Sequence, residues 1–264
     1  MTKASGVRSA VTIGVMLAAL AIAAGPPGAI GASGQDVSPA RVTRTFTIPP
    51  DRPIVVEATV ADVSIAAWAR EEVEVQIERR AEKGADLARI EPRFDDRSDA
   101  LRISTRQADG PPDRALRVSM GIRAPARAVF KSVQVVDGRI LLEGLRGAVT
   151  ADLRQGSIEG TRLGGTVRLE TGFGNVDLRQ AELTPGGLLR LRAFNGNVTL
   201  HLASVPQNAR ILALSFNGAV TSDIPLTMRD RFGPRFGEAT LGSGEPVISL
   251  DAVYGDVAIR IEKK

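Results

Sequence analysis

A glycine followed two residues later by Ile or Val recurs through the second half of this 264-residue chain. The six pairs are Gly138/Ile140, Gly156/Ile158, Gly174/Val176, Gly196/Val198, Gly218/Val220 and Gly255/Val257. The glycines stand 18, 18, 22, 22 and 37 residues apart, and the residue five positions before each one is always apolar. A unit of this length cannot bury its own apolar face, so neighbouring copies must complete one shared core.

The residues around each glycine predict a strand, a tight turn and a second strand. Counted from the glycine, positions −5 and +2 are apolar in all six copies, whereas position −4 is polar or charged in five of them. Strand alternation therefore places position −5 on an inner face and position −4 on an outer face. Asn195-Gly196 and Asn217-Gly218 tolerate the positive φ that a sharp corner requires.

Two all-β architectures produce this pattern. In a parallel β-solenoid each unit is one coil, and equivalent positions stack about 4.8 Å apart. In an antiparallel sandwich or meander the same Asn-Gly corners are hairpin turns. We favour the β-solenoid, which predicts that Glu170 pairs with Arg192 and that Arg168 lies beside Arg190. A hairpin arrangement would not bring those residues together.

The chain between the N-terminal leader and the repeats also has β character. The segments with strand patterning are 44–48, 54–60, 63–67, 72–78, 101–105 and 116–122. Residues 85–90 allow a short helix, and the Pro- and Asp-containing segment 109–113 predicts a loop. We divide the mature chain into an N-terminal region, 35–128, and a repeat array, 129–264. The pattern leaves open whether the N-terminal region forms the first coils, a cap or a separate domain.

Residues 1–34 read as a secretory signal peptide. Lys3 and Arg8 precede an apolar run from Val11 to Ala24, and small residues suited to cleavage follow near Ala32. As a helix this run rises only about 21 Å, less than the roughly 30 Å hydrocarbon core, which argues against a membrane anchor. We therefore expect an exported protein, periplasmic or at the cell surface, that meets the membrane only during export.

Composition argues against several classes of chemistry. The chain has no cysteine and one histidine, His201, so a metal site of nitrogen and sulfur ligands cannot be assembled. No Gly-x-Ser-x-Gly elbow accompanies that histidine, which we interpret as an exposed strand residue. Asp95, Asp96 and Asp99 lie among arginines and read as a solvated loop rather than a calcium site. We expect no cofactor, no metal and no catalytic residues.

The charge pattern does not predict nucleic-acid binding. The formal net charge is only +4, and Lys3 and Arg8 of the leader contribute two of those charges. The remaining basic and acidic residues are interspersed along the chain rather than gathered into a basic block. This pattern is typical of a solvated surface.

The sequence around the repeats resembles the bacterial putative-adhesin family of unknown function, whose members carry strand repeats centred on an Asn-Gly-Asp-Val type motif. The matching segments are Phe173-Gly174-Asn175-Val176, Phe194-Asn195-Gly196-Asn197-Val198, Phe216-Asn217-Gly218-Ala219-Val220 and Tyr254-Gly255-Asp256-Val257. The stretch from Ala61 to Trp68, followed by 72–75, resembles the family's opening motif, with Ala61 where glycine is usual. The resemblance covers 42–262. It implies a β-repeat protein of the cell envelope and supplies no catalytic residues.

Two sets of side chains are candidates for binding. Arg168, Arg190 and Arg192, stacked on one face, would present guanidinium groups to an anionic polymer or lipid head group. The alternative is that these arginines form ion pairs with Glu170 and Asp152. The second set consists of aromatic residues at the corners, which we interpret as closing the core, with a sugar-stacking platform as the alternative. These residues are Phe173, Phe194, Phe216 and Tyr254.

The sequence thus predicts an exported, non-catalytic, adhesin-like interaction or structural module of the bacterial envelope. Its expected partner is an envelope glycan, a lipid head group or another envelope protein. One alternative is a polysaccharide-active β-helix enzyme, which would need clustered carboxylates such as Asp152, Glu170 and Asp177. Another is an envelope-stress regulatory partner that recruits a strand at an exposed sheet edge.

Overall fold

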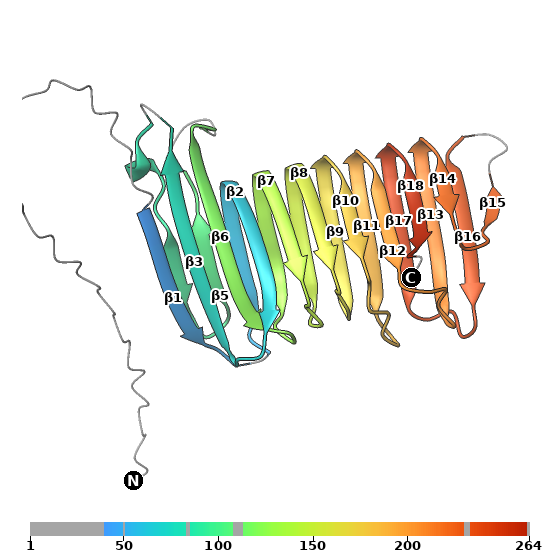
Figure 1. Cartoon of the computed structure of the whole chain (residues 1–264), viewed down its shortest axis with the longest axis horizontal. Coiled ribbons are helices and arrows are strands. Elements are labelled where there is room, and N and C mark those ends of the chain that lie inside the picture. Colours follow the sequence, from blue (N-terminus) through green and yellow to red (C-terminus); the bar gives the residue numbers. More distant parts are fainter. Residues whose placement is uncertain (1–39, 50, 83–84, 108–112, 230–232, 263–264) are drawn as a thin grey trace, which may run out of the picture. The chain divides into compact units, whose positions relative to one another are not determined.

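The computed structural model describes residues 40–49, 51–82, 85–107, 113–229 and 233–262. These residues form an all-β body whose strands belong to one large, mostly parallel sheet that does not close on itself (Figure 1). The predicted leader, 1–34, lies outside the described residues, as does most of the predicted loop at 109–113. Within the described residues, no helix is long and apolar enough to span a bilayer.

The strands follow the alternating segments of the sequence. The N-terminal elements are β1 (Ala40–Thr47), β2 (Ile54–Trp68), β3 (Glu72–Ala81), the 3-10 turn η1 (Leu87–Arg89), β4 (Arg93–Asp96), β5 (Leu101–Thr105) and β6 (Leu116–Pro125). The next elements are β7 (Phe130–Glu143), β8 (Val149–Thr161), β9 (Thr166–Phe173), β10 (Val176–Arg179), β11 (Leu188–Asn195) and β12 (Val198–Leu202). The last are β13 (Ala209–Asn217), β14 (Val220–Ser222), β15 (Thr227–Arg229), β16 (Arg235–Leu241), β17 (Val247–Tyr254) and β18 (Val257–Ile261). The short helix expected at 85–90 is the single turn η1, and β4 occupies part of the expected solvated loop.

Each repeat unit has a first arm that ends at the corner glycine and a second arm that follows it. First arms pair in parallel in the order β2, β7, β8, β9, β11, β17, β13. Second arms pair in parallel in the order β2, β7, β8, β10, β12, β18, β14. The register places Arg192 opposite Glu170 and Arg190 opposite Arg168, so these two predicted neighbour pairs are confirmed.

The last two units are stacked in the reverse of their sequence order. Strand β17 pairs with β11 on one side and with β13 on the other, so the Gly255 unit lies between the Gly196 and Gly218 units. The long spacing between Gly218 and Gly255 contains β15 and β16, and β16 runs antiparallel along the outer edge of β13. Strand β16 thus covers β13, the outermost first arm, and the chain that follows forms β17 and β18 between the Gly196 and Gly218 units.

The N-terminal strands extend the same sheet. In β2, Ala61 lies opposite Gly138 of β7, and the other edge of β2 pairs in parallel with β5 and β6. Three antiparallel strands follow: β3 on β6, β1 on β3, and β4 on β5. Strand β2 therefore forms one more unit of the repeat, with both arms in one strand.

The inward-facing residues of both arms form one core. Position −5 is buried in every unit, and position +2 is buried in all but the Gly218 unit, where Val220 is partly buried. The loops that follow the second arms add Leu145 and Leu163, which are also buried. Because both arms and these loops contribute to the same cluster, each unit depends on its neighbours for a complete core.

The corner glycines stack directly on one another. A Cβ atom on Gly174 would lie 1.8 Å from the carbonyl oxygen of Gly156, and one on Gly196 would lie 1.8 Å from that of Gly174. The equivalent overlaps are between 1.7 and 2.2 Å at Gly138, Gly156, Gly218 and Gly255. The φ angles of Gly174 and Gly196, +143° and +147°, are also ones that residues with side chains rarely adopt.

Side-chain oxygens join the corners at position +1. Asn175 Oδ1 accepts a hydrogen bond from the backbone N–H of Asn197 at 2.9 Å, and Asn197 Oδ1 accepts one from Asp256 at 2.9 Å. Asp256 Oδ1 in turn accepts one from Ala219 at 2.7 Å. These bonds satisfy backbone donors between the two arms, where the chain turns. They give a physical reason for Asn or Asp after the corner glycine.

Replacing Gly174 with alanine should strongly destabilise the fold, by about 3 kcal/mol or more, because the new Cβ meets backbone on a neighbouring strand and the φ angle is strained. The free energy of unfolding in urea would measure the effect. Gly121→Ala is the matched control: its Cβ would have only an ordinary 4.0 Å contact, so we expect a change within about 0.5 kcal/mol. Similar effects at both sites would contradict the stacking argument.

Replacing Asn197 with alanine should cost about 1 kcal/mol, because the N–H of Asp256 loses its acceptor. Asn197→Asp keeps the Oδ1 acceptor and should restore most of that stability. Urea unfolding of the two variants tests this role. Equal losses in both would show that the side-chain oxygen is not what stabilises the corner.

Candidate functional site

The three candidate arginines lie on the outer face of two adjacent first arms, with Arg168 on β9 opposite Arg190 on β11. Arg192 Nη1 is 3.5 Å from Glu170 Oε1, and Arg190 Nε is 3.9 Å from Asp251 Oδ2. Among the described residues, Arg168 has no ion pair within 4.0 Å. Asp251 was not a predicted partner, because the repeat does not reveal that β17 inserts beside β11.

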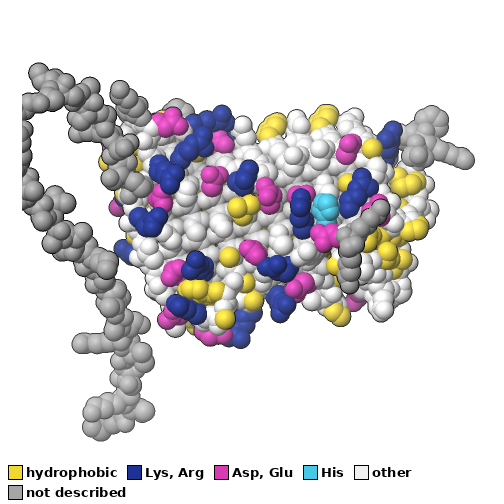
Figure 2. Space-filling view, in the orientation of Figure 1, with side chains coloured by type: hydrophobic (Ala, Val, Ile, Leu, Met, Phe, Trp, Pro, Cys, Tyr) yellow, Lys and Arg dark blue, Asp and Glu magenta, His cyan; other side chains and the backbone are white. Residues whose placement is uncertain are grey.

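These ion pairs hold the arginines only weakly. The side chains of Arg190 and Arg192 are 51% and 42% exposed, and such pairs typically contribute at most about 1 kcal/mol. Basic and acidic side chains are interspersed on the face shown in Figure 2, in keeping with the sequence pattern. The guanidinium groups can therefore exchange a protein carboxylate for another anion at little cost.

The three candidate carboxylates do not converge on one site. Asp152 on β8 lies directly opposite Glu170 on β9, in the first arms. Asp177 lies on β10, a second arm, where its carboxylate accepts a hydrogen bond from Arg179 Nε at 3.0 Å. This bond raises the pKa of Arg179 above its ordinary value. His201 Nε2 is 3.5 Å from Asp177, and the histidine side chain is partly buried rather than fully exposed.

The acidic residues near β4 are engaged by arginines. Asp95 pairs with Arg97 at 2.8 Å, Asp96 pairs with Arg52, and Asp99 pairs with Arg102 at 2.6 Å. The hydrogen bond from Arg102 lowers the pKa of Asp99. In the part of the chain that the structure describes, no group of three or more His, Asp or Glu side chains is arranged to hold a metal ion.

The corner aromatics do not close the core, so that interpretation is wrong. Each is about half exposed: Phe173 54%, Phe194 49%, Tyr254 51% and Phe216 53%. Position −3, the last inward-facing position before the corner, is buried in these units and holds Thr171, Ala193, Ala252 and Ser215. Strand alternation then directs the side chain at position −2 outward, and the residue at position −1, next to the corner glycine, is exposed as well.

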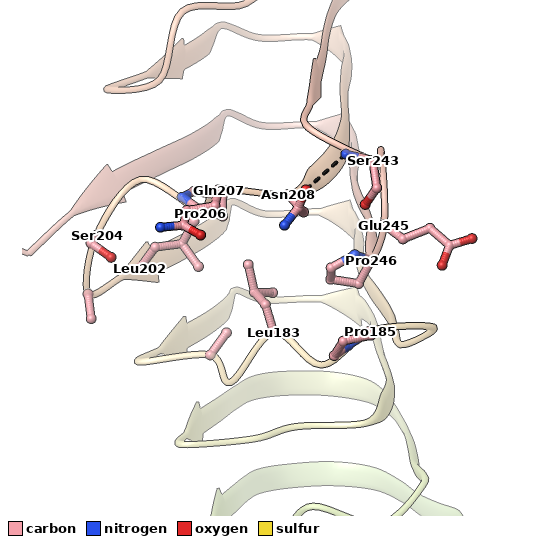
Figure 3. Close-up of a pocket in the computed structure, with 12 residues that line it drawn as sticks. Leu183, Pro185, Leu202, Ser204, Pro206, Gln207, Asn208, Ser243, Glu245 and Pro246 are labelled. Atoms are coloured by element: carbon pink, nitrogen blue, oxygen red, sulfur yellow. Dashed lines mark hydrogen bonds between the residues drawn. The ribbon is translucent and has the colours of Figure 1, made fainter.

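A pocket of about 420 Å³ opens among the loops that follow the second arms (Figure 3). In the corresponding loops after β7 and β8, Leu145 and Leu163 are buried and fill this space. In the loop after β10, Leu183 is only partly buried, and in the loop after β12 the exposed Val205 takes the place of a leucine. Leu183, Leu202 and Pro246 supply apolar walls, and Asn208 Oδ1 accepts a hydrogen bond from the N–H of Ser243 at 2.9 Å. The sequence signal that could have indicated this pocket is the lack of a leucine between Ala203 and Asn208, where the earlier loops have one.

Comparison with known proteins finds similarity in structure rather than in sequence. No protein-family model and no curated protein matches the chain. A crystal structure of a putative cell adhesion protein from Clostridium sporogenes matches with a TM-score of 0.50 and 12% identity, over 84% of this chain and 100% of that one. A crystal structure of a putative adhesin from Bacteroides fragilis matches with a TM-score of 0.42 and 12% identity, over 83% and 97% of the two chains. At this identity, the Clostridium match shows a shared fold.

Proposed function

We propose that this chain is an exported, non-catalytic, adhesin-like module of the bacterial envelope, built as a β-solenoid that presents rows of equivalent side chains. The observation that carries the proposal is the parallel register, which sets Arg168 and Arg190 opposite each other on adjacent strands, with Arg192 two residues further along β11. These three residues, the arginine row, offer several guanidinium contacts on one face to a repetitive partner. Weak individual contacts then sum to useful binding.

Two further observations support an envelope role. The fold is shared with a protein named as a putative cell adhesion protein, and the sequence begins with a segment that reads as a signal peptide. Together they favour a location outside the cytoplasm, at the cell surface or in the periplasm. An anionic envelope glycan or lipid head group suits the arginine row best, and another envelope protein is the remaining partner class.

The enzymatic and regulatory alternatives have less support. Asp177 lies on a second arm, whereas Asp152 and Glu170 lie on first arms, so the three carboxylates do not form one catalytic group. For edge pairing, open edges exist at both ends of the sheet: within the described residues, β14 pairs only with β18, and the eight-residue strand β1 pairs only with β3. These edges support the regulatory alternative, whereas the exposed arginines and the shared fold favour the adhesin-like module.

Co-sedimentation of the exported chain with isolated bacterial envelopes tests the proposal, at low and high salt. Replacing Arg168, Arg190 and Arg192 with glutamine should weaken binding about tenfold, since three surface charge contacts each contribute about 0.5 kcal/mol. High salt should weaken binding of the unmodified chain in the same way.

The matched control replaces Arg80, Arg97 and Arg127, three exposed arginines of the N-terminal region, with glutamine. This control should bind like the unmodified chain. Equal loss in both variants would show a nonspecific charge effect rather than a site. Failure of the unmodified chain to bind any envelope fraction would contradict the proposed function itself.

A further inference from the structure

The exposed corner aromatics form a continuous uncharged stripe across four adjacent units. We define the corner stripe as positions −2 and −1 of these units, in spatial order: Gly172-Phe173, Phe194-Asn195, Val253-Tyr254 and Phe216-Asn217. None of these eight residues carries a charged side chain. The stripe gathers four of the chain's ten aromatic residues, including its one tyrosine, at a place where they are half exposed. A contiguous exposed aromatic surface of this kind marks a binding surface.

The aromatic residues alternate between two rows along the stripe. Position −1 reads Phe173, Asn195, Tyr254 and Asn217 across the four units, and the strand register places these residues opposite one another. Position −2 carries Phe194 and Phe216 in the units where position −1 is asparagine. The alternation exists only in spatial order: in chain order the two phenylalanines at position −2 are consecutive.

This alternation keeps the rings from stacking on one another. Aromatic residues at the same position of adjacent strands would lie about 4.8 Å apart and cover each other's faces. Here Phe194 and Tyr254 meet edge to face, with ring centroids 5.8 Å apart and an interplanar angle of 73°. Rings in the same row, such as Phe173 and Tyr254, are two strands apart, about 9.6 Å.

Amide side chains lie between the rings. Asn195 is placed between Phe173 and Tyr254, and Asn217 lies opposite Tyr254 on the far side. Asn217 Nδ2 donates a hydrogen bond to the Val253 carbonyl at 3.4 Å, which leaves its Oδ1 to accept another. The stripe therefore combines flat apolar surfaces with neutral hydrogen-bonding groups at a fixed repeat.

We infer that the corner stripe binds an uncharged polysaccharide, an inference that rests on the proposed adhesin-like function and adds a second ligand site to it. A pyranose ring has an apolar C–H face that packs on an aromatic ring, and its hydroxyls suit amide partners. A polymer of sugar rings also matches a surface that repeats at a constant spacing. The absence of charge in the stripe separates this ligand from the anionic polymers that would suit the arginine row.

Affinity electrophoresis of the full exported chain through gels that contain hydroxyethylcellulose, dextran or galactomannan tests the inference. At least one of these neutral polysaccharides should retard the unmodified chain, equally at low and high salt. The variant Phe194→Leu/Tyr254→Leu keeps apolar bulk but loses both flat rings, and its Kd should rise at least about tenfold, which corresponds to about 1.4 kcal/mol. Both side chains are half exposed, so folding should be preserved, as urea unfolding would check.

A control locates the effect. Val205→Ala removes an equally exposed apolar side chain away from the stripe and should bind like the unmodified chain. No retardation by any of the polysaccharides would overturn the inference, as would undiminished binding by the double leucine variant. Self-association that this variant abolishes would instead identify the stripe as a contact between copies, and would also overturn it.

The envelope assay separates this inference from the proposed function. A chain that co-sediments with envelopes but ignores neutral polysaccharides retains the proposed function and loses the polysaccharide ligand. A chain that binds neither envelopes nor polysaccharides loses both. Binding to both, with only the polysaccharide contact reduced by the double leucine variant, supports the corner stripe as a separate ligand site.

Discussion

Backbone packing between corner glycines is the constraint on which the rest of the structure depends. From Ala61 to Gly218, each corner lies so close to the next that a single Cβ atom would overlap a carbonyl oxygen. The strands on both sides of the corner can therefore keep one register through the whole stack. That register is what aligns the buried residues, the Asn and Asp oxygens and the exposed rows, so a side chain in place of any of the six corner glycines would disturb all of them.

The tight corner also decides which side chains reach the surface. In the units with aromatic corners, the last inward-facing position is small, and the hydroxyls of Thr171 and Ser215 there donate hydrogen bonds to the carbonyl oxygens of Gly156 and Gly255 in adjacent units. The two positions between it and the glycine lie outside the core. The exposure of Phe194 and Tyr254 is thus a consequence of their positions relative to the corner, and it places aromatic surface where neighbouring units are closest.

Local periodicity predicted what depends on a single unit, and it could not predict what depends on the order of units. The alternation around each glycine identified the buried positions and the Arg192–Glu170 pair. It could not show that the Gly255 unit lies between the Gly196 and Gly218 units, because either stacking order fits the same register. The Arg190–Asp251 contact was missed for this reason. The same alternation places position −2 on the outer face, so the exposure of Phe194 and Phe216 could have been predicted; at position −1 the corner interrupts the alternation, so that of Phe173 and Tyr254 could not.

The inserted unit links architecture to surface chemistry. If units were stacked in chain order, Phe194 and Phe216 would occupy the same position of adjacent strands and would cover each other's faces. Insertion of β17 between β11 and β13 separates them with Tyr254, which sits one position later in its unit. The same insertion brings Asp251 to Arg190 and leaves β16 free to cover β13. One change in strand order therefore lets β16 cover the outer edge of β13, pairs an exposed arginine and keeps the aromatic faces available.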